Sequence, residues 1–77
     1  MITGIQVRMA RNGLKWNASE LSIKSGVGLS TVNKIDRADG FPPVRMENLQ
    51  AIRDTLLATG RVRFEGETGV FVGGEDT

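Results

Sequence analysis

The side chains of this sequence that could do chemistry are mostly basic, and they are concentrated in its first part. Residues 1–45 carry seven basic residues against three acidic ones, a balance of +4. Those basic residues are Arg8, Arg11, Lys15, Lys24, Lys34, Arg37 and Arg45. Residues 46–77 carry three basic residues against six acidic ones, a balance of −3. The net charge of +1 is therefore the sum of a basic first part and an acidic second part of the chain. Because a polyanion binds where positive charge accumulates, the first 45 residues are predicted to bind one.

Catalytic chemistry has few side chains to use in this sequence. The 77 residues include no cysteine and no histidine, which excludes Cys-His and Ser-His nucleophilic systems, imidazole acid-base catalysis and Cys/His zinc clusters. The carboxylates, lysines and hydroxyls that remain form no convincing cluster, and no glycine-rich phosphate motif occurs. We therefore expect a protein that is not an enzyme and that needs no cofactor and no metal.

The length limits the core that the chain can build. A chain of 77 residues buries only about 60% of the surface that it exposes when unfolded, so a partner subunit would add useful burial. The apolar runs are too short to cross a membrane, and residues 1–4 lack the basic and apolar regions of a signal peptide. We expect a cytoplasmic protein with no membrane partner.

Two capping boxes predict the helices that come first in the chain. Thr3 and Gln6 have the spacing of a capping box, so a first helix should open at Thr3. Asn17 and Glu20 repeat the pattern and open a second helix over residues 18–25. The apolar stripe of the first helix consists of Val7, Ala10 and Leu14.

A glycine turn separates the second helix from a third. Gly26 and Gly28 both tolerate positive φ, and residues 29–37 are long enough for two helical turns. In that third helix Val32 and Ile35 lie three apart and should face inward. The residues that then point elsewhere are Ser30, Asn33, Lys34 and Arg37. This predicts a helix, a short turn and a helix, an arrangement compatible with any small helical bundle.

The rest of the chain predicts a fourth helix and then a segment in which the spacing of apolar residues changes from a helical to a strand-like repeat. The Pro42-Pro43 pair marks a loop, and a helix follows over residues 45–59 with Gly60 as its stop. Its buried row should be Leu49, Ile52 and Leu56. Residues 61–77 then alternate apolar and polar side chains around a glycine-containing turn, which predicts a β-hairpin with a frayed end at residues 73–77.

The order of residues in the helical part resembles the Cro/cI-like (XRE) helix-turn-helix family. The resemblance rests on QVRMAR (6–11), WNASEL (16–21) and GVGLSTVNKIDR (26–37), and it covers residues 5–57. It implies a mainly α fold: a compact four-helix bundle over residues 1–60, with a helix-turn-helix whose third helix enters the major groove of double-stranded DNA. Residues 61–77 would follow as a short C-terminal β-hairpin.

The resemblance also implies which residues would touch DNA. The base-reading positions would be Leu29, Ser30, Asn33 and Lys34. The phosphate contacts would come from Arg8, Lys15, Asn17, Lys24, Thr31, Arg37 and Arg45. Arg11 and Asp36 stand where the family often has a structural ion pair. Ala18 and Gly28 depart from the family, which commonly has a phosphate-anchoring glutamine and a Ser or Thr cap at these places.

These observations lead to one main hypothesis and one alternative. The main hypothesis is a small phage or bacterial transcriptional regulator, a repressor that binds a palindromic operator as a homodimer. An isolated hairpin is marginal in water, so the tail should pair two copies. The residues assigned to that contact are Val62, Phe64, Val70, Phe71 and Val72. The alternative is a protein-interaction module, of the antitoxin or transcription-cofactor type, whose partner is another transcription protein.

Overall fold

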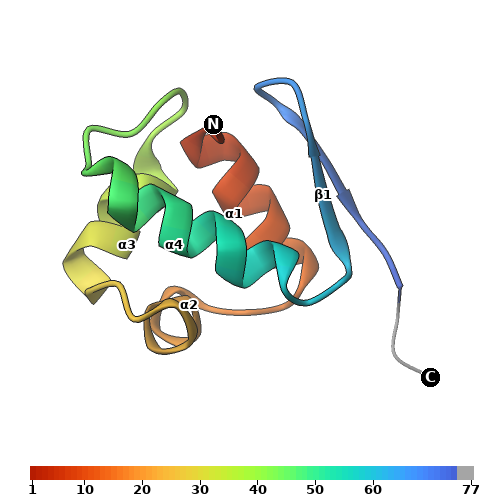
Figure 1. The fold of residues 1–77 in the computed structure, drawn as a ribbon, viewed down its shortest axis with the longest axis horizontal. Coiled ribbons are helices and arrows are strands. Elements are labelled where there is room, and N and C mark those ends of the chain that lie inside the picture. Colours follow the sequence, from red (N-terminus) through yellow and green to blue (C-terminus); the bar gives the residue numbers. More distant parts are fainter. Residues whose placement is uncertain (75–77) are drawn as a thin grey trace.

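Residues 1–74 fold into four helices followed by a two-stranded antiparallel hairpin, as the sequence predicts (Figure 1). The structure is a computed structural model, and it describes these 74 residues. Its elements are α1 (Gly4–Gly13), α2 (Ala18–Ser25), α3 (Leu29–Arg37), α4 (Met46–Leu57), β1 (Val62–Glu65) and β2 (Gly69–Val72). The frayed end predicted from the sequence falls partly on residues 75–77, which lie outside the described part.

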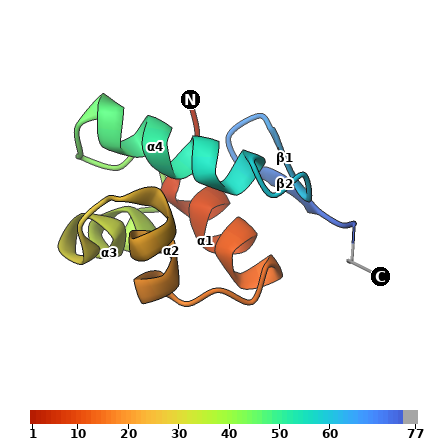
Figure 2. The ribbon, with the colours of Figure 1, turned by 60° about the horizontal axis from the view of Figure 1, so that its bottom comes forward.

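Helix α1 is the central element of the fold. It lies between α3 on one side and the hairpin on the other, and α4 crosses over it (Figures 1 and 2). The inward rows predicted for three helices are confirmed, because each of their residues is buried. They are Val7 and Ala10 of α1 with its C-cap Leu14, Val32 and Ile35 of α3, and Leu49, Ile52 and Leu56 of α4.

Both predicted capping boxes are present. The Thr3 hydroxyl accepts a hydrogen bond from the Gln6 amide at 3.3 Å, and the Gln6 side chain accepts one from the Thr3 amide at 3.0 Å. Asn17 and Glu20 exchange the same two bonds, both at 2.8 Å. These reciprocal bonds satisfy amides that have no partner within the helix, and therefore α1 and α2 begin where the sequence predicts.

The turn between α2 and α3 needs one unusual backbone conformation. Gly26 has φ +75° and closes α2, whereas Gly28 has φ −57° and precedes α3. Of the two glycines that tolerate positive φ, Gly26 alone uses it. The Ser22 hydroxyl donates to the Val27 carbonyl at 2.6 Å, and the Val27 side chain is buried. The turn is thus held by a hydrogen bond on one side and by the core on the other.

Substitution of Gly28 by serine should stabilise the protein by about 0.5 kcal/mol. Serine can adopt the φ of Gly28, and a Cβ there would meet no atom within 4 Å. The hydroxyl would also cap α3, which has no side-chain cap. Chemical denaturation measures the change. Gly26 is the matched control, because a Cβ there also meets nothing within 4 Å but φ is +75°. Gly26→Ser should destabilise the protein by about 1 kcal/mol. Equal effects at the two sites would show that the difference in φ between Gly26 and Gly28 does not decide the outcome.

Helix α4 is shorter than predicted at both ends. It covers 12 residues, and Arg45 and Ala58 form its caps instead of belonging to it. Arg45 has extended backbone angles, with φ −64° and ψ 140°, so the helix begins only at Met46. At the other end the Thr59 hydroxyl donates to the Leu56 carbonyl at 2.8 Å, which ends the helix one turn before Gly60. No helix in residues 1–74 has both the length and the apolar character that a membrane span requires.

The hairpin is anchored on α1 by a buried polar side chain. Gln6 is fully buried, and its Nε2 donates to the carbonyls of Gly66 and Gly69, both at 2.9 Å. The Thr3 hydroxyl donates to the Glu67 carbonyl at 2.6 Å. Residues of the first capping box thus also hold the hairpin turn. The helical part and the tail consequently share one core, although the sequence suggests a division near residue 60.

Side chains of the hairpin alternate between the bundle and solvent. Val62 is buried, and the partly buried side chains that pack against the core are Phe64, Val70 and Val72. Phe71 points the other way and is 55% exposed. The bundle therefore covers one face of the hairpin, and the face that carries Phe71 is open. Gly73 was expected to fray, yet it donates to the Arg61 carbonyl at 2.9 Å and so extends the pairing.

Candidate nucleic-acid interface

The outward face of α3 carries the hydrogen-bonding side chains that the sequence singled out. Val32 and Ile35 are fully buried, which fixes the rotation of the helix. The opposite face is accessible, with Leu29 at 43% exposure. Exposed or half-buried beside it are Ser30, Asn33 and Lys34. All four predicted base-reading residues therefore share one accessible helix face.

Helix α3 is held at its C-terminal end by two arginines of α1. The Arg11 guanidinium binds Asp36 through two nearly parallel hydrogen bonds, Nε to Oδ1 at 2.8 Å and Nη2 to Oδ2 at 3.0 Å. Its Nη1 donates to the Trp16 carbonyl at 2.8 Å. The side chains of Arg11 and Asp36 are only 13% and 19% exposed, so the ion pair is largely shielded from water. The pairing predicted for these two residues is confirmed.

Arg8 has a structural role in place of the expected phosphate contact. Its Nη1 donates to the carbonyls of Asp36 at 2.6 Å and Ala38 at 3.3 Å, and its Nη2 lies 3.4 Å from Asp39. These carbonyls belong to the end of α3, where backbone acceptors lack helical partners. The guanidinium of Arg8 therefore closes α3 and is occupied within the fold, which the sequence could not indicate because Arg8 lies 28 residues away from Asp36.

A hollow of about 490 Å³ lies between α3 and the start of α4. Thr31 and Lys34 line it from α3, and Arg45 and Asn48 line it from the N-terminal end of α4. Two positive charges, a hydroxyl and an amide thus meet beside the accessible face of α3. Three of these residues belong to the predicted DNA-contacting set, and the fold brings them together.

Asn48 is the residue of this hollow that the sequence analysis missed. It lies in the first turn of α4 and is half-buried, with its side chain directed toward the hollow lined by Lys34 and Arg45. The signal that could have revealed it is its spacing of three residues from Arg45, which places both on one side of the helix.

The other predicted phosphate contacts do not join this hollow. Lys24 lies over the Trp16 ring, with its Nζ 5.0 Å from the ring centroid, near the C-terminal half of α4. Trp16 itself is half-buried and packs against the core. Lys15 is exposed in the turn between α1 and α2, Asn17 is exposed at the N-cap of α2, and Arg37 is exposed at the end of α3. Of the predicted phosphate-contacting residues, two thus line this hollow, namely Thr31 and Arg45. Those that lie apart from it are Lys15, Asn17, Lys24 and Arg37.

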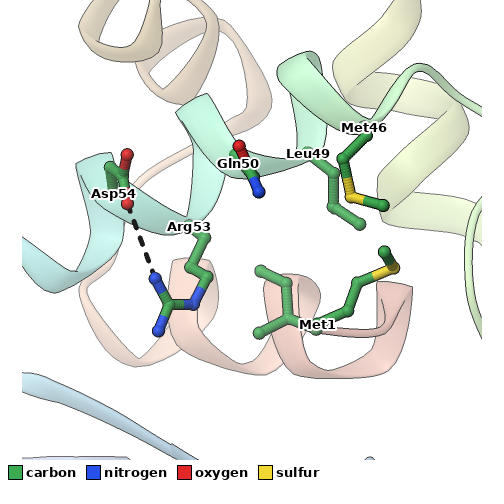
Figure 3. Close-up of a pocket in the computed structure, with 7 residues that line it drawn as sticks. Met1, Met46, Leu49, Gln50, Arg53 and Asp54 are labelled. Carbon is green, nitrogen blue, oxygen red and sulfur yellow. Dashed lines mark ion pairs between the residues drawn. The ribbon is translucent and has the colours of Figure 1, made fainter.

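A second hollow lies elsewhere and has a different character. It measures about 540 Å³ and opens between the N-terminal residues and α4 (Figure 3). Met1, Met46 and Leu49 face one another across it, and Arg53 and Asp54 pair at 3.6 Å on its rim. Within residues 1–74 no three Asp, Glu, His or Cys side chains gather as a metal site would require. Gln50 also lines this hollow, whose lining is thus partly apolar and partly polar, and it offers no constellation for proton transfer or nucleophilic attack.

Comparisons of the chain with protein-family models, with curated proteins and with solved structures find no match. The functional argument therefore proceeds from the geometry.

Proposed function

We propose that the protein binds double-stranded DNA in a sequence-specific manner, with α3 in the major groove. The observation that carries the proposal is the accessible face of α3, whose polar side chains project from a helix fixed by the core and by two arginines. A helix of this size fits the major groove, where each base pair presents a distinct pattern of donors and acceptors. A rigid helix limits the entropy lost when side chains meet base edges.

The side chains of this face match the chemistry of base edges. An asparagine amide such as that of Asn33 can bond adenine with two hydrogen bonds, and an ammonium group such as that of Lys34 can donate to guanine O6 and N7. The hydroxyl of Ser30 can bond several bases, and Leu29 can contact a thymine methyl group.

Backbone phosphates would be held beside this face. In the proposed complex, Arg45 and Asn48 bind a phosphate at the hollow between α3 and α4, and Thr31 adds a hydroxyl. Such contacts set the register of the helix on the duplex and carry no sequence information. Arg37, Lys15 and Asn17 would contact phosphates further along the strands.

We propose a regulatory role as a repressor that acts without catalysis. A bound dimer of such a small protein can block polymerase by occupying its site, and this requires no further surface. A palindromic operator would follow from the symmetry of the dimer.

Substitution of Asn33 by alanine should weaken binding to the preferred duplex by about 1 to 3 kcal/mol and binding to random duplex far less. The preferred duplex is first obtained by selecting bound sequences from a random pool. Affinities for both duplexes are then measured by fluorescence anisotropy at one fixed salt concentration.

Arg45→Ala is the matched control for this experiment. It removes a proposed phosphate contact next to the same face, so it should weaken binding to both duplexes by similar factors. If Asn33→Ala lowered both affinities equally, Asn33 would not read a base.

One observation favours the second candidate, a module that binds another protein. Met1 and Met46 are 61% and 51% exposed at the hollow of Figure 3, and methionine-rich surfaces adapt to protein partners. The salt dependence of DNA affinity separates the candidates. A protein that contacts several phosphates loses affinity steeply as salt rises, whereas a chain whose basic face is incidental shows no measurable duplex affinity to lose.

A further inference from the structure

The outward face of the hairpin carries a small hollow that the proposed DNA contact does not use. It measures about 290 Å³ and lies at the end of the hairpin away from its turn. Arg61 and Arg63 line it from one strand, and Phe71, Gly73 and Gly74 line it from the other strand and the residues that follow. The hairpin and α3 flank α1 from two sides (Figure 1), so this hollow lies apart from the accessible face of α3.

The guanidinium of Arg61 is held in place by the hairpin itself. Its Nε donates to the Gly73 carbonyl at 2.9 Å, and the Gly73 amide donates to the Arg61 carbonyl, also at 2.9 Å. A guanidinium carries further N–H donors on its two Nη atoms. None of the hydrogen bonds formed within residues 1–74 uses those of Arg61. Arg61 therefore presents fixed donors to a ligand in the hollow.

The guanidinium of Arg63 is held by an aromatic ring. Arg63 and Phe71 face each other in the register, and the guanidinium carbon lies 4.7 Å from the ring centroid, as in a cation–π contact. The ring also lies close to the backbone of Gly73, where a Cβ would be 2.9 Å from Cε2 of Phe71. Glu65 approaches the Nε of Arg63 at 3.6 Å, which is too long for a hydrogen bond. The Nη groups of Arg63 thus also remain available.

The two guanidiniums share one side of the hairpin. Arg61 and Arg63 are two residues apart, and side chains with that spacing point to the same face of a strand. No aspartate or glutamate of residues 1–74 lines the hollow, so two positive charges meet there without a carboxylate between them. Three of the lining residues are glycines, namely Gly60, Gly73 and Gly74. Their bare backbone allows a ligand to approach closely.

We propose that this hollow binds the phosphate group of a phosphate monoester. Guanidinium groups present paired N–H donors that match the oxygens of phosphate and carboxylate groups. A phosphate monoester carries close to two negative charges at neutral pH, so it balances both arginines, whereas a carboxylate balances one. Pockets for whole ligands measure about 300 to 1,000 Å³. The hollow lies at the lower limit of this range and suits a small group.

The surroundings of the hollow favour a single compact anion over a long polyanion. Residues 46–77 have a charge balance of −3, and Glu65 and Glu67 are exposed on the same hairpin. A nucleic acid laid along the hairpin would meet these carboxylates, whereas one phosphate group meets the two arginines. The proposed ligand is therefore distinct from the DNA proposed for α3, and its binding does not depend on DNA.

Titration of the full chain with inorganic phosphate, followed by ¹H–¹⁵N NMR at constant ionic strength and about pH 8, tests the site. The amides of Gly73 and Gly74 and the Nε–H of Arg61 should shift along a saturable curve, with a dissociation constant on the order of 1 mM. Acetate should bind about fivefold more weakly, since it carries one charge. Because the spectrum reports each residue separately, phosphate bound between α3 and α4 is measured apart.

Two substitutions of Arg63 and a control test its role. Arg63→Gln should raise the phosphate dissociation constant about fivefold or more, because it removes one positive charge with its paired donors. Arg63→Lys keeps the charge over Phe71 but loses the planar fork, so its dissociation constant should lie between the two. Arg53→Gln is the matched control. Arg53 also lies 3.6 Å from a carboxylate, but on α4 and outside this hollow, so its loss should leave the dissociation constant unchanged.

The phosphate group belongs either to a small metabolite or to a phosphorylated side chain of a protein, and two further titrations distinguish these sources. Glycerol 3-phosphate represents the first and a short phosphoserine peptide the second, and the tighter ligand identifies the source. Three results would overturn the proposal. They are the absence of saturable shifts at Gly73 and Gly74 up to about 50 mM phosphate, acetate that binds as tightly as phosphate, and an Arg63→Gln variant that binds phosphate as tightly as the unchanged protein.

Discussion

Replacement of Asp36 by alanine is expected to lower the free energy of unfolding by about 3 kcal/mol. The carboxylate accepts two hydrogen bonds from Arg11, and the Arg11 side chain is only 13% exposed. Without Asp36 this guanidinium would keep one carbonyl partner, that of Trp16, and would otherwise stay desolvated without its counter-charge. The cost arises from the stranded charge more than from the loss of the pair itself. Urea denaturation followed by circular dichroism measures it.

A double substitution separates these two contributions. Arg11→Met combined with Asp36→Leu removes both charges and fills a similar volume, so it should recover most of the loss. Losses that simply add in the double variant would mean that no stranded charge is involved. Asp39→Ala is the matched control: Asp39 also pairs with an arginine of α1, but it is 86% exposed, and its removal should change stability by less than about 0.5 kcal/mol.

Replacement of Gln6 by glutamate is expected to have a similarly large effect, about 3 kcal/mol of destabilisation near neutral pH. The side-chain nitrogen of Gln6 donates to the carbonyls of Gly66 and Gly69 in a fully buried site. A carboxylate has the same shape, but it would place negative charge against these carbonyls with no donor to offer. Because protonation neutralises it and restores one donor, the destabilisation should shrink as the pH is lowered toward 4.

Gln50 provides the control for this substitution. It is exposed on α4, so Gln50→Glu should alter stability by no more than about 0.5 kcal/mol and without that pH dependence. Thermal denaturation at several pH values compares the two variants. A Gln6→Glu protein as stable as the Gln50→Glu protein at neutral pH would show that Gln6 does not anchor the hairpin.

The elements of this fold could be predicted largely from the sequence because their signals are local. Thr3 with Gln6 and Asn17 with Glu20 are three residues apart, and each pair closes its capping box without help from the rest of the chain. The inward rows of α1, α3 and α4 depend on the helical repeat alone. The C-terminal end of α4 was less predictable. The helix stops where the Thr59 hydroxyl donates a hydrogen bond to the Leu56 carbonyl, and the spacing of apolar residues gives no sign of this side-chain bond.

The sequence by itself thus determined the four helices, the hairpin and the face of α3 that points outward, because residues within one or two turns decide them. Only the tertiary structure decided how Arg8, Gln6 and Asn48 are used. Arg8 caps a helix 28 residues away, and Gln6 binds a turn 60 residues away. Asn48 and Lys34 come to line the same hollow only because the fold brings the start of α4 near α3. Such contacts depend on how finished elements pack, and many packings satisfy the same local pattern, so no spacing along the chain encodes them.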